Sequence, residues 1–375
     1  PPNWLSLLRD SILERAKAAM ESAEDVKDQE LRKLIVENLK AEQIVRETNA
    51  WTMTLGESDL IASEVMHEQV LRTLLDRASS YIYISDANLS AEKINGLAPD
   101  IEKAVRRGVL IDIIWRSMGN SAENADESLA ALHHIASEAS KGNSSGGSLT
   151  MGKNPSGAEA QLVIADPNGR FEGWLGCGSW LSSKRSGNVS VRVHERNAVA
   201  LLCRVAADIA GSDERLGNGA GVFRLRNASA FLLSHEQGQA DSAAAIRVSF
   251  IFGREHRPVA MELLAQAKSS VRLSASHVDL DGGLILETLV RLGESGINDL
   301  QLTLPSEFVD AQLLTSLEKL GFVIDRGLTP GNWLVVDDNA LLISTHSLLS
   351  SEGLTGKPDR RVLGVLLIGE SVGIA

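Results

Sequence analysis

From about residue 58 onward, hydrophobic residues switch repeatedly between strand spacing and helix spacing. Residues 81–85 and 109–115 are short apolar runs typical of buried strands. Residues 66–78, 101–107 and 129–140 place apolar side chains three and four apart, which predicts amphipathic helices. Strands that alternate with helices predict an α/β fold in which helices cover a mostly parallel or mixed sheet.

The first part of the chain has a different pattern. Residues 4–50 repeat apolar positions at helical spacing, with charges on the other faces and no Gly or Pro after the start. We therefore assign residues 1–57 to an N-terminal helical segment. It is either a packing helix or helical hairpin, or an arm that contacts a partner or a missing part of a longer protein.

The order of predicted elements recurs in the second half of the chain. Residues 269–274 resemble 79–84, residues 300–304 resemble 110–114, and residues 361–368 resemble 189–193. This predicts an internal duplication with lobe 1 at 58–210 and lobe 2 at 246–375. Residues 211–245, rich in Gly, Ala, Ser and Asn, form the predicted connection, with a flexible loop at 217–221. Lobe 2 lacks a counterpart of the helix that ends lobe 1.

Two stretches share one pattern, an apolar run, an Asp, a second apolar run and then small polar residues. They are EAQLVIADPNGRFEGWLGCGSWLSS at 159–183 and PGNWLVVDDNALLISTHSLLSS at 330–351. They resemble the motif of the phospholipase D superfamily, His-x-Lys, four residues, Asp, six residues, then Gly-Ser-x-Asn. Asp166 and Asp337 match the Asp, although the first gap to Gly176 is three residues too long. Ser344 stands where the second copy should have its Gly. The resemblance implies two phospholipase D-like lobes whose mixed sheets, flanked by helices, share one core and one cleft.

The resemblance also implies which chemistry is missing. In the family one His attacks phosphorus, the other protonates the leaving oxygen, and the lysines stabilise the phosphoryl charge. The His positions fall on Glu159 and Pro330, and the Lys positions fall on Gln161 and Asn332. The terminal Asn is replaced by Ser179 and Ser347 in the two copies. We therefore expect no phosphodiester hydrolysis by the family mechanism.

Other side chains are candidate substitutes. His346 lies within the second turn motif and His277 follows the first strand of lobe 2; the alternative is a polar turn or loop residue in each case. Glu159 is a candidate acid or base in a rebuilt site with Asp166 and His346, or else an exposed relic. His256, between charged neighbours, suggests a solvated turn, with a phosphate contact as the alternative.

No metal or cofactor is expected from these residues. The pair Asp337 and Asp338 has no further ligands at metal spacing, and His133 and His134 point to different faces of one helix. The chain has no glycine-rich loop of the Walker or Rossmann type.

The charge balance restricts nucleic-acid binding to local patches. The net charge is −12, so the chain as a whole does not attract phosphate. Basic residues follow both motif turns and, with Ser179 and Ser347, are candidates for phosphate contacts; solvated loops are the alternative. The basic residues are Lys184, Arg185, Lys357, Arg360 and Arg361. Aromatic residues make up 4% of the chain and supply no stacking platform for single strands.

The remaining composition suggests a cytoplasmic protein. Two cysteines exclude a disulfide framework, and no apolar run reaches the length of a membrane span. The chain begins Pro-Pro, which suggests a longer protein. The sequence therefore predicts a catalytically degenerate binding or assembly module in a bacterial nucleic-acid-processing or defence complex. Its partners would be proteins, the rest of a longer chain, or nucleic acid, with no membrane. The alternative is a divergent phosphodiesterase or nuclease with a rebuilt site.

Overall fold

The computed structural model divides the chain into two compact units, residues 1–50 and 51–375. The described residues are 50–116, 122–152, 156, 159–182, 189–211, 219–234, 245–278, 283–307, 311–327, 331–350 and 362–369. Residues 4–49 of the predicted helix at 4–50 lie outside them. The second unit contains both lobes.

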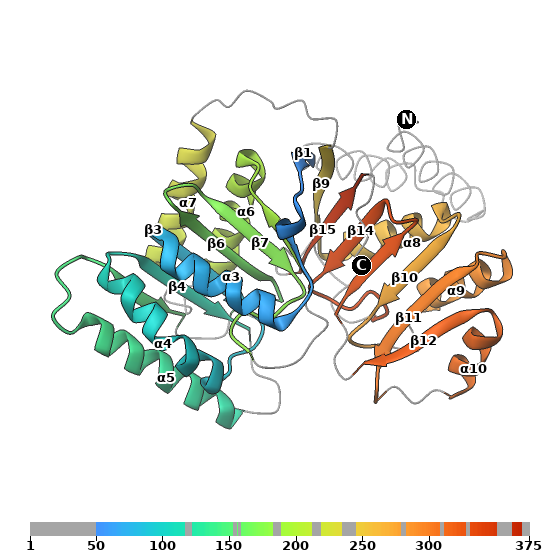
Figure 1. Ribbon diagram of the computed structural model, residues 1–375, viewed down its shortest axis with the longest axis horizontal. Helices are drawn as coiled ribbons and strands as arrows, with labels where there is room; N and C mark the ends of the chain where they lie inside the picture. Colours follow the sequence, from blue (N-terminus) through green and yellow to red (C-terminus); the bar gives the residue numbers. More distant parts are fainter. Residues whose placement is uncertain are drawn as a thin grey trace, which may run out of the picture. The chain divides into compact units, whose positions relative to one another are not determined.

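Lobe 1 is built on a mixed sheet of seven strands (Figure 1). Across the sheet the order is β2-β8-β7-β6-β3-β4-β5, in which β3–β4 and β4–β5 pair in parallel and the other pairs are antiparallel. The strands are β2 (Leu60–Ile61), β3 (Ala78–Asp86), β4 (Leu110–Trp115), β5 (Ser148–Met151), β6 (Gln161–Pro167), β7 (Glu172–Gly176) and β8 (Ser190–Val193).

Lobe 2 repeats this order strand for strand. Its sheet begins with β1 (Ala50–Thr54) and runs β1-β9-β15-β14-β13-β10-β11-β12, and β10–β11 and β11–β12 are the parallel pairs. Apart from β1, each strand therefore has a counterpart in lobe 1. The strands are β9 (Ala245–Phe252), β10 (Ser270–Ser274), β11 (Asp299–Pro305), β12 (Phe322–Gly327), β13 (Trp333–Val336), β14 (Ala340–Ser344) and β15 (Leu363–Ile368).

Helices flank both sheets (Figure 1). Three helices of lobe 1 share a hydrophobic cluster with one face of its sheet, and α6 and α7 share another with the opposite face. The helices of lobe 1 and the connection are α3 (Glu64–Arg77), α4 (Ala91–Arg106), α5 (Ala122–Ser140), α6 (Arg196–Ala210) and α7 (Gly219–Leu233). Those of lobe 2 are α8 (His256–Gln266), α9 (Gly283–Glu294) and α10 (Ala311–Lys319). One-turn helices precede β2 at Glu57–Asp59 and α8 at Gly253–Glu255.

The central strands of lobe 1 are buried on both faces, which is why they appear as nearly continuous apolar runs. In β3, Tyr81 and Tyr83 belong to the cluster that contains α6, whereas Ile82 and Ile84 belong to the cluster that contains α3, α4 and α5. Successive side chains on a strand point to opposite faces, so a strand covered on both sides needs apolar residues at every position.

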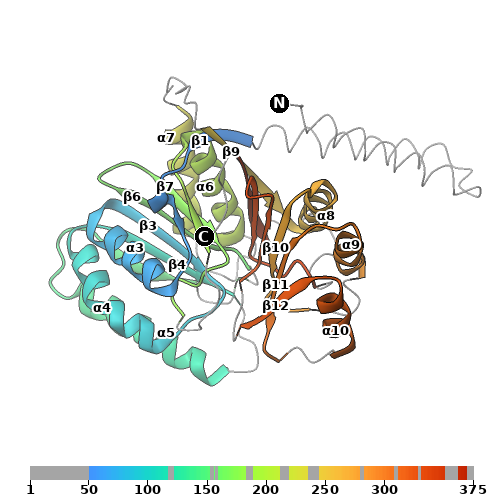
Figure 2. The same cartoon turned by 45° about the vertical axis from the view of Figure 1, so that its right-hand side comes forward.

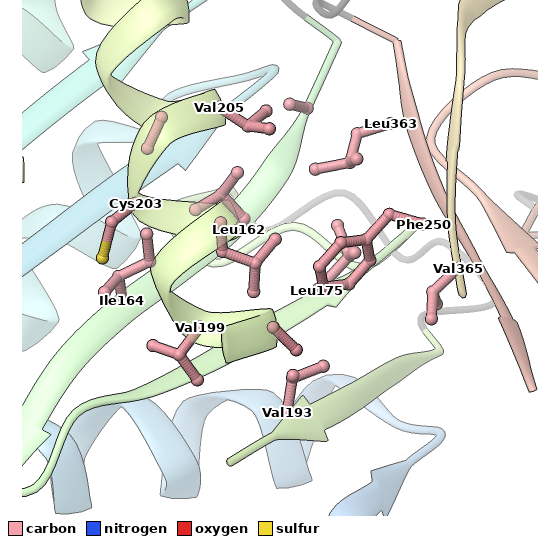
Figure 3. Packing of buried hydrophobic residues seen from close by; sticks show 14 of the residues in the cluster. Leu162, Ile164, Leu175, Val193, Val199, Cys203, Val205, Phe250, Leu363 and Val365 are labelled. Carbon is pink, nitrogen blue, oxygen red and sulfur yellow. The ribbon is translucent and has the colours of Figure 1, made fainter. Parts of the chain in front are cut away.

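The two lobes share one hydrophobic core around α6. In Figure 3, Leu162 and Leu175 of lobe 1 strands are drawn between α6, which carries Val199 and Cys203, and Phe250 and Val365 of lobe 2; all belong to one hydrophobic cluster. Ten of the fifteen residues of α6 are buried, so this helix is apolar on almost every side. Figure 2 shows α6 where the two sheets approach each other. Each fully buried Val or Phe in such a core contributes about 1.5–3 kcal/mol relative to exposure.

Two segments differ from the sequence prediction. Residues assigned to the end of the N-terminal helical segment instead form β1 (Ala50–Thr54), next to β9 at the edge of the lobe 2 sheet. Met53 is buried and the Trp51 ring lies 5.2 Å from that of Phe250, so packing favours the strand. The predicted connection contains α7, which begins at Gly219 within the stretch assigned to a flexible loop.

Candidate functional site

The motif aspartates hold the same position in the two lobes. Asp166, near the end of β6, accepts hydrogen bonds from the backbone N–H groups of Ser79, Ser80 and Tyr81 at the start of β3, at 2.9–3.2 Å. Asp337, directly after β13, accepts them from Lys268, Ser269 and Ser270 at the entry to β10, at 2.8–3.2 Å. In each lobe the carboxylate also accepts from a serine hydroxyl. Both aspartates therefore hold neighbouring strands together.

Two further matched bonds fix the register of the motifs. The Ser85 hydroxyl donates to the Ala160 carbonyl in lobe 1, and the Ser274 hydroxyl donates to the Gly331 carbonyl in lobe 2, both at 2.8 Å. Ala160 and Gly331 directly follow the two family His positions. Glu159 and Pro330 are therefore equivalent, although Pro330 itself lies outside the described residues.

The two residues at the family Lys positions are amides with different surroundings. Gln161 begins β6, and its Oε1 is buried without a hydrogen-bond partner. Asn332 is buried, and its Oδ1 accepts from the Ser276 backbone N–H at 2.8 Å. The Asn332 amide oxygen is thus committed to a loop of lobe 2. Neither residue carries the positive charge that a lysine would give.

Glu159 and His346 meet across the two lobes. Glu159 Oε2 lies 2.8 Å from His346 Nδ1, and Glu159 Oε1 lies 2.7 Å from Arg116 Nη2. Glu159 is 15% exposed, His346 is 11% exposed and Arg116 is 45% exposed. Arg116 directly follows β4, and His346 lies two residues after the end of β14. The structure thus brings together two of the predicted substitutes and adds an arginine that the sequence analysis did not single out.

These neighbours set the protonation of Glu159. Burial alone would raise the pKa of its carboxyl group, but the His346 hydrogen bond and the charges of His346 and Arg116 outweigh burial and leave that pKa lowered. Glu159 is therefore an anion near neutral pH. The carboxylate beside Nδ1 favours a proton on that nitrogen of His346, and Nε2 is the other nitrogen of the ring. That Nε2 is buried without a hydrogen-bond partner.

His256 is a second buried imidazole near this pair, and the expectation of a solvated turn is wrong. It is 2% exposed, its Nδ1 lies 2.7 Å from the Gly253 carbonyl oxygen, and its Nε2 has no hydrogen-bond partner. The pKa of His256 is lowered to about 4, mainly by burial, against which the bond to the Gly253 carbonyl acts, and with a smaller contribution from His346 in the same direction as burial. His256 is therefore neutral at pH 7.

A comparison of the lobes explains why Nε2 of His256 has no side-chain partner. Its counterpart is His67 of α3, whose Nε2 lies 2.8 Å from the Ser190 hydroxyl of β8. The position of Ser190 is occupied by Gly364 in β15, and a Cβ there would lie 2.4 Å from His256 Nε2. Aligning the two sequence halves at their first helices would have identified this histidine pair.

The other predicted residues have structural partners or lie elsewhere. The Ser179 hydroxyl lies 3.0 Å from both carboxylate oxygens of Asp86, and the Ser347 hydroxyl donates to the His277 carbonyl. The His277 side chain is exposed and is not part of the Glu159–His346 pair. Lys184, Arg185, Lys357, Arg360 and Arg361 lie outside the described residues.

Two classes of feature are not found in the described part of the chain. No group of three or more His, Cys, Asp or Glu side chains is positioned there to hold a metal ion. Among the described helices, none combines the length and the apolar character needed to span a membrane.

Solved structures resemble the fold of this chain. A phosphatidylserine synthase from Haemophilus influenzae, a phospholipase D superfamily member, matches with a TM-score of 0.56 at 13% identity. The match covers 88% of this chain and 86% of the synthase. This chain has the phospholipase D fold. No protein-family model and no curated protein matches the sequence.

Two other superfamily members match the phospholipase D-fold chain with lower scores. The phospholipase D family member Nuc from Salmonella typhimurium has a TM-score of 0.27 at 12% identity, over 34% of this chain and 84% of Nuc. A polyphosphate kinase from Porphyromonas gingivalis has a TM-score of 0.41 at 10% identity, over 86% of this chain and 47% of the kinase.

Proposed function

We propose that this protein is a catalytically degenerate phospholipase D-fold module that binds a partner and does not cleave phosphodiesters. The observation that carries the proposal is the state of Glu159, a carboxylate at a family His position. Its two oxygens are already bonded to Arg116 and His346. A buried anion repels the negatively charged phosphoryl group that the family mechanism must receive. The neutral Gln161 and Asn332 supply no charge to offset that repulsion.

The partner we propose is nucleic acid or protein within a bacterial nucleic-acid-processing or defence complex. Nucleic acid would be held by the basic residues after the two motif turns, Lys184, Arg185, Lys357, Arg360 and Arg361. Phosphate contacts of this kind need only positive charge, so they survive the loss of a nucleophile. A protein partner would use other surfaces of this acidic chain, including its N-terminal segment.

Binding of fluorescent single- and double-stranded DNA and RNA, measured over a salt series with product gels on the same samples, tests the proposal. We expect binding that weakens with salt and no cleavage. Replacing the five basic residues by Gln should flatten the logarithmic salt slope of duplex binding by about four. Replacing the exposed Lys103 and Lys141 should flatten it less.

Two results would contradict this expectation, cleavage of nucleic acid and the absence of binding. Cleavage by the wild-type protein would overturn the proposal. Absence of any nucleic-acid binding would leave protein assembly as the function, to be tested by co-purification with the proteins encoded beside it.

One observation favours a second function, a divergent phosphodiesterase that uses His346. Its Nδ1 is oriented by Glu159, and its Nε2 is buried without a hydrogen-bond partner. As a general base or nucleophile, this Nε2 would first have to become accessible to a substrate. Cleavage that disappears in both Glu159→Gln and His346→Ala would establish this function. Cleavage that persists in both variants would assign the activity to a contaminant or to another site.

A further inference from the structure

The Glu159 carboxylate occupies a position that an anionic ligand would suit. One of its oxygens faces a guanidinium of lobe 1, and the other faces an imidazole of lobe 2. Arginine and histidine in this arrangement are common partners of phosphate oxygens, because both donate charge-assisted hydrogen bonds. The carboxylate presents two acceptor oxygens and a negative charge, which are also what a phosphate group presents.

The charges of the three groups favour an internal pairing over an external ligand. Arg116 contributes a positively charged guanidinium group. Glu159 is negative near neutral pH and cancels that charge, so an approaching phosphate meets little net attraction. If the carboxylate moves away, Arg116 and His346 both lose a partner, and a phosphate in its place restores both contacts.

We propose that Glu159 is a built-in competitor of phosphate, and that a phosphate group binds between Arg116 and His346 only when it displaces this carboxylate. The inference rests on the proposed function, because it assumes a site that binds phosphate without cleaving it. Glu159 joins the two lobes through His346, so displacement also breaks a side-chain bond between them. Ligand binding is thereby coupled to the contact between the lobes.

The surroundings of His346 support displacement over simple addition of a ligand. Its Nδ1 is occupied by Glu159, whereas its Nε2 is buried. A phosphate that reaches the imidazole must therefore take the place of Glu159 or open the packing around Nε2. Arg116, at 45% exposed, is the solvent-facing end of the group and is where a ligand would make its first contact.

Titration of the intact chain with inorganic phosphate, followed by calorimetry, tests the competition. Glu159→Gln removes the charge and retains the shape, and we expect it to bind phosphate about ten- to a hundredfold more tightly than the wild type. Glu138→Gln is the matched control. It makes the same change in net charge at a surface glutamate that pairs with Lys141, and its phosphate affinity should equal that of the wild type. Adding Arg116→Gln to Glu159→Gln should abolish the gain.

Equal phosphate affinity in Glu159→Gln and Glu138→Gln would overturn the inference. If Glu159→Gln does not fold, the wild-type protein gives the answer through the NMR resonances of the His346 ring. Saturating phosphate should shift the Nδ1 resonance as its carboxylate partner leaves. Phosphate that binds without moving this resonance would also overturn the inference.

The outcomes separate this inference from the proposed function. Nucleic-acid binding through the basic clusters together with unchanged phosphate affinity in Glu159→Gln would overturn the competition alone. Cleavage of nucleic acid by the wild type would overturn the proposed function, whatever the phosphate titration gives.

Discussion

Replacing each motif aspartate by alanine tests whether the repeated sequence motif stabilises the fold by holding neighbouring strands together. Asp166 and Asp337 accept equivalent backbone bonds, but their exposure differs. Asp166 is 3% exposed, and its bond from the Tyr81 N–H is fully buried. Most of the Asp337 bonds are exposed to solvent. After substitution, water can replace Asp337 more easily than Asp166.

The expected magnitudes follow from this difference. Hydrogen bonds to a charged group contribute about 1.5–3 kcal/mol each, and a buried donor left without a partner costs about 1–3 kcal/mol. Asp166 serves three N–H groups through one oxygen, so the terms overlap, and we expect Asp166→Ala to cost about 3–5 kcal/mol. Asp337→Ala should cost about 1–2 kcal/mol. Part of that cost is backbone strain, because Asp337 has a φ of 51°, where aspartate is tolerated better than alanine.

Chemical denaturation followed by tryptophan fluorescence measures both costs, and Trp174 and Trp180 report on lobe 1 from its core. Asp337→Asn is the control, because asparagine keeps both an acceptor oxygen and tolerance of positive φ; it should cost less than about 1 kcal/mol. Equal costs for the two alanine variants, or a cost below about 1 kcal/mol for Asp166→Ala, would refute the argument from burial.

The same bonds predict a pH dependence for lobe 2. Burial opposes ionisation of Asp337, but the N–H groups of Ser270, Ser269 and Lys268 prevail and lower its pKa below the ordinary 3.8. A carboxyl group with a lowered folded-state pKa stabilises the fold above its unfolded pKa and loses that contribution as pH falls through the folded value. The difference in stability between wild type and Asp337→Asn should therefore shrink below about pH 4. A difference that is constant between pH 7 and pH 3 would contradict this.

Other substitutions test the packing of lobe 1. Gly178→Ala should destabilise the protein by about 3 kcal/mol, because its Cβ would lie 2.2 Å from the buried Nε2 of His67. Gly96→Ala, on an open face of α4, should instead stabilise it by about 0.5–1 kcal/mol, and thermal unfolding would show the opposite signs. Arg224→Ala should lower the free energy of unfolding by about 3 kcal/mol, because it leaves the fully buried Asp112 carboxylate without its cationic partner. A loss below about 1 kcal/mol in a urea titration would show that water replaces the arginine.

The elements that sequence patterns located well are those with strong periodicity and apolar runs. The strand predicted at 109–115 is β4 (Leu110–Trp115), and the predicted strand at 300–304 lies within β11. The helix predicted from residue 101 begins ten residues earlier, at Ala91, because the Ser90 hydroxyl caps it and tertiary packing tolerates Gly96 and Pro99 inside it. Local breaker signals therefore gave the wrong helix start.

The strands that sequence patterns missed depend on their neighbours. Residues 148–151 form β5 through parallel pairing with β4, and residues 322–327 form β12 by the same pairing with β11. Both are edge strands with exposed or half-buried positions, so their hydrophobic pattern is weak. Hydrogen bonds to the neighbouring strand make these residues strands, although their own hydrophobic pattern does not predict it.

The sequence by itself determined the order of the elements, the positions of Asp166 and Asp337, and the loss of the family His and Lys side chains. These properties depend on residue type and on spacing along one strand or hairpin. Only the tertiary structure decided that Glu159 meets His346, 187 positions away, with Arg116 beside it and His256 buried nearby. These contacts exist because the lobes pack around α6. Hydrophobic periodicity predicts which residues face a core, but it does not predict which residues of the other lobe they contact there.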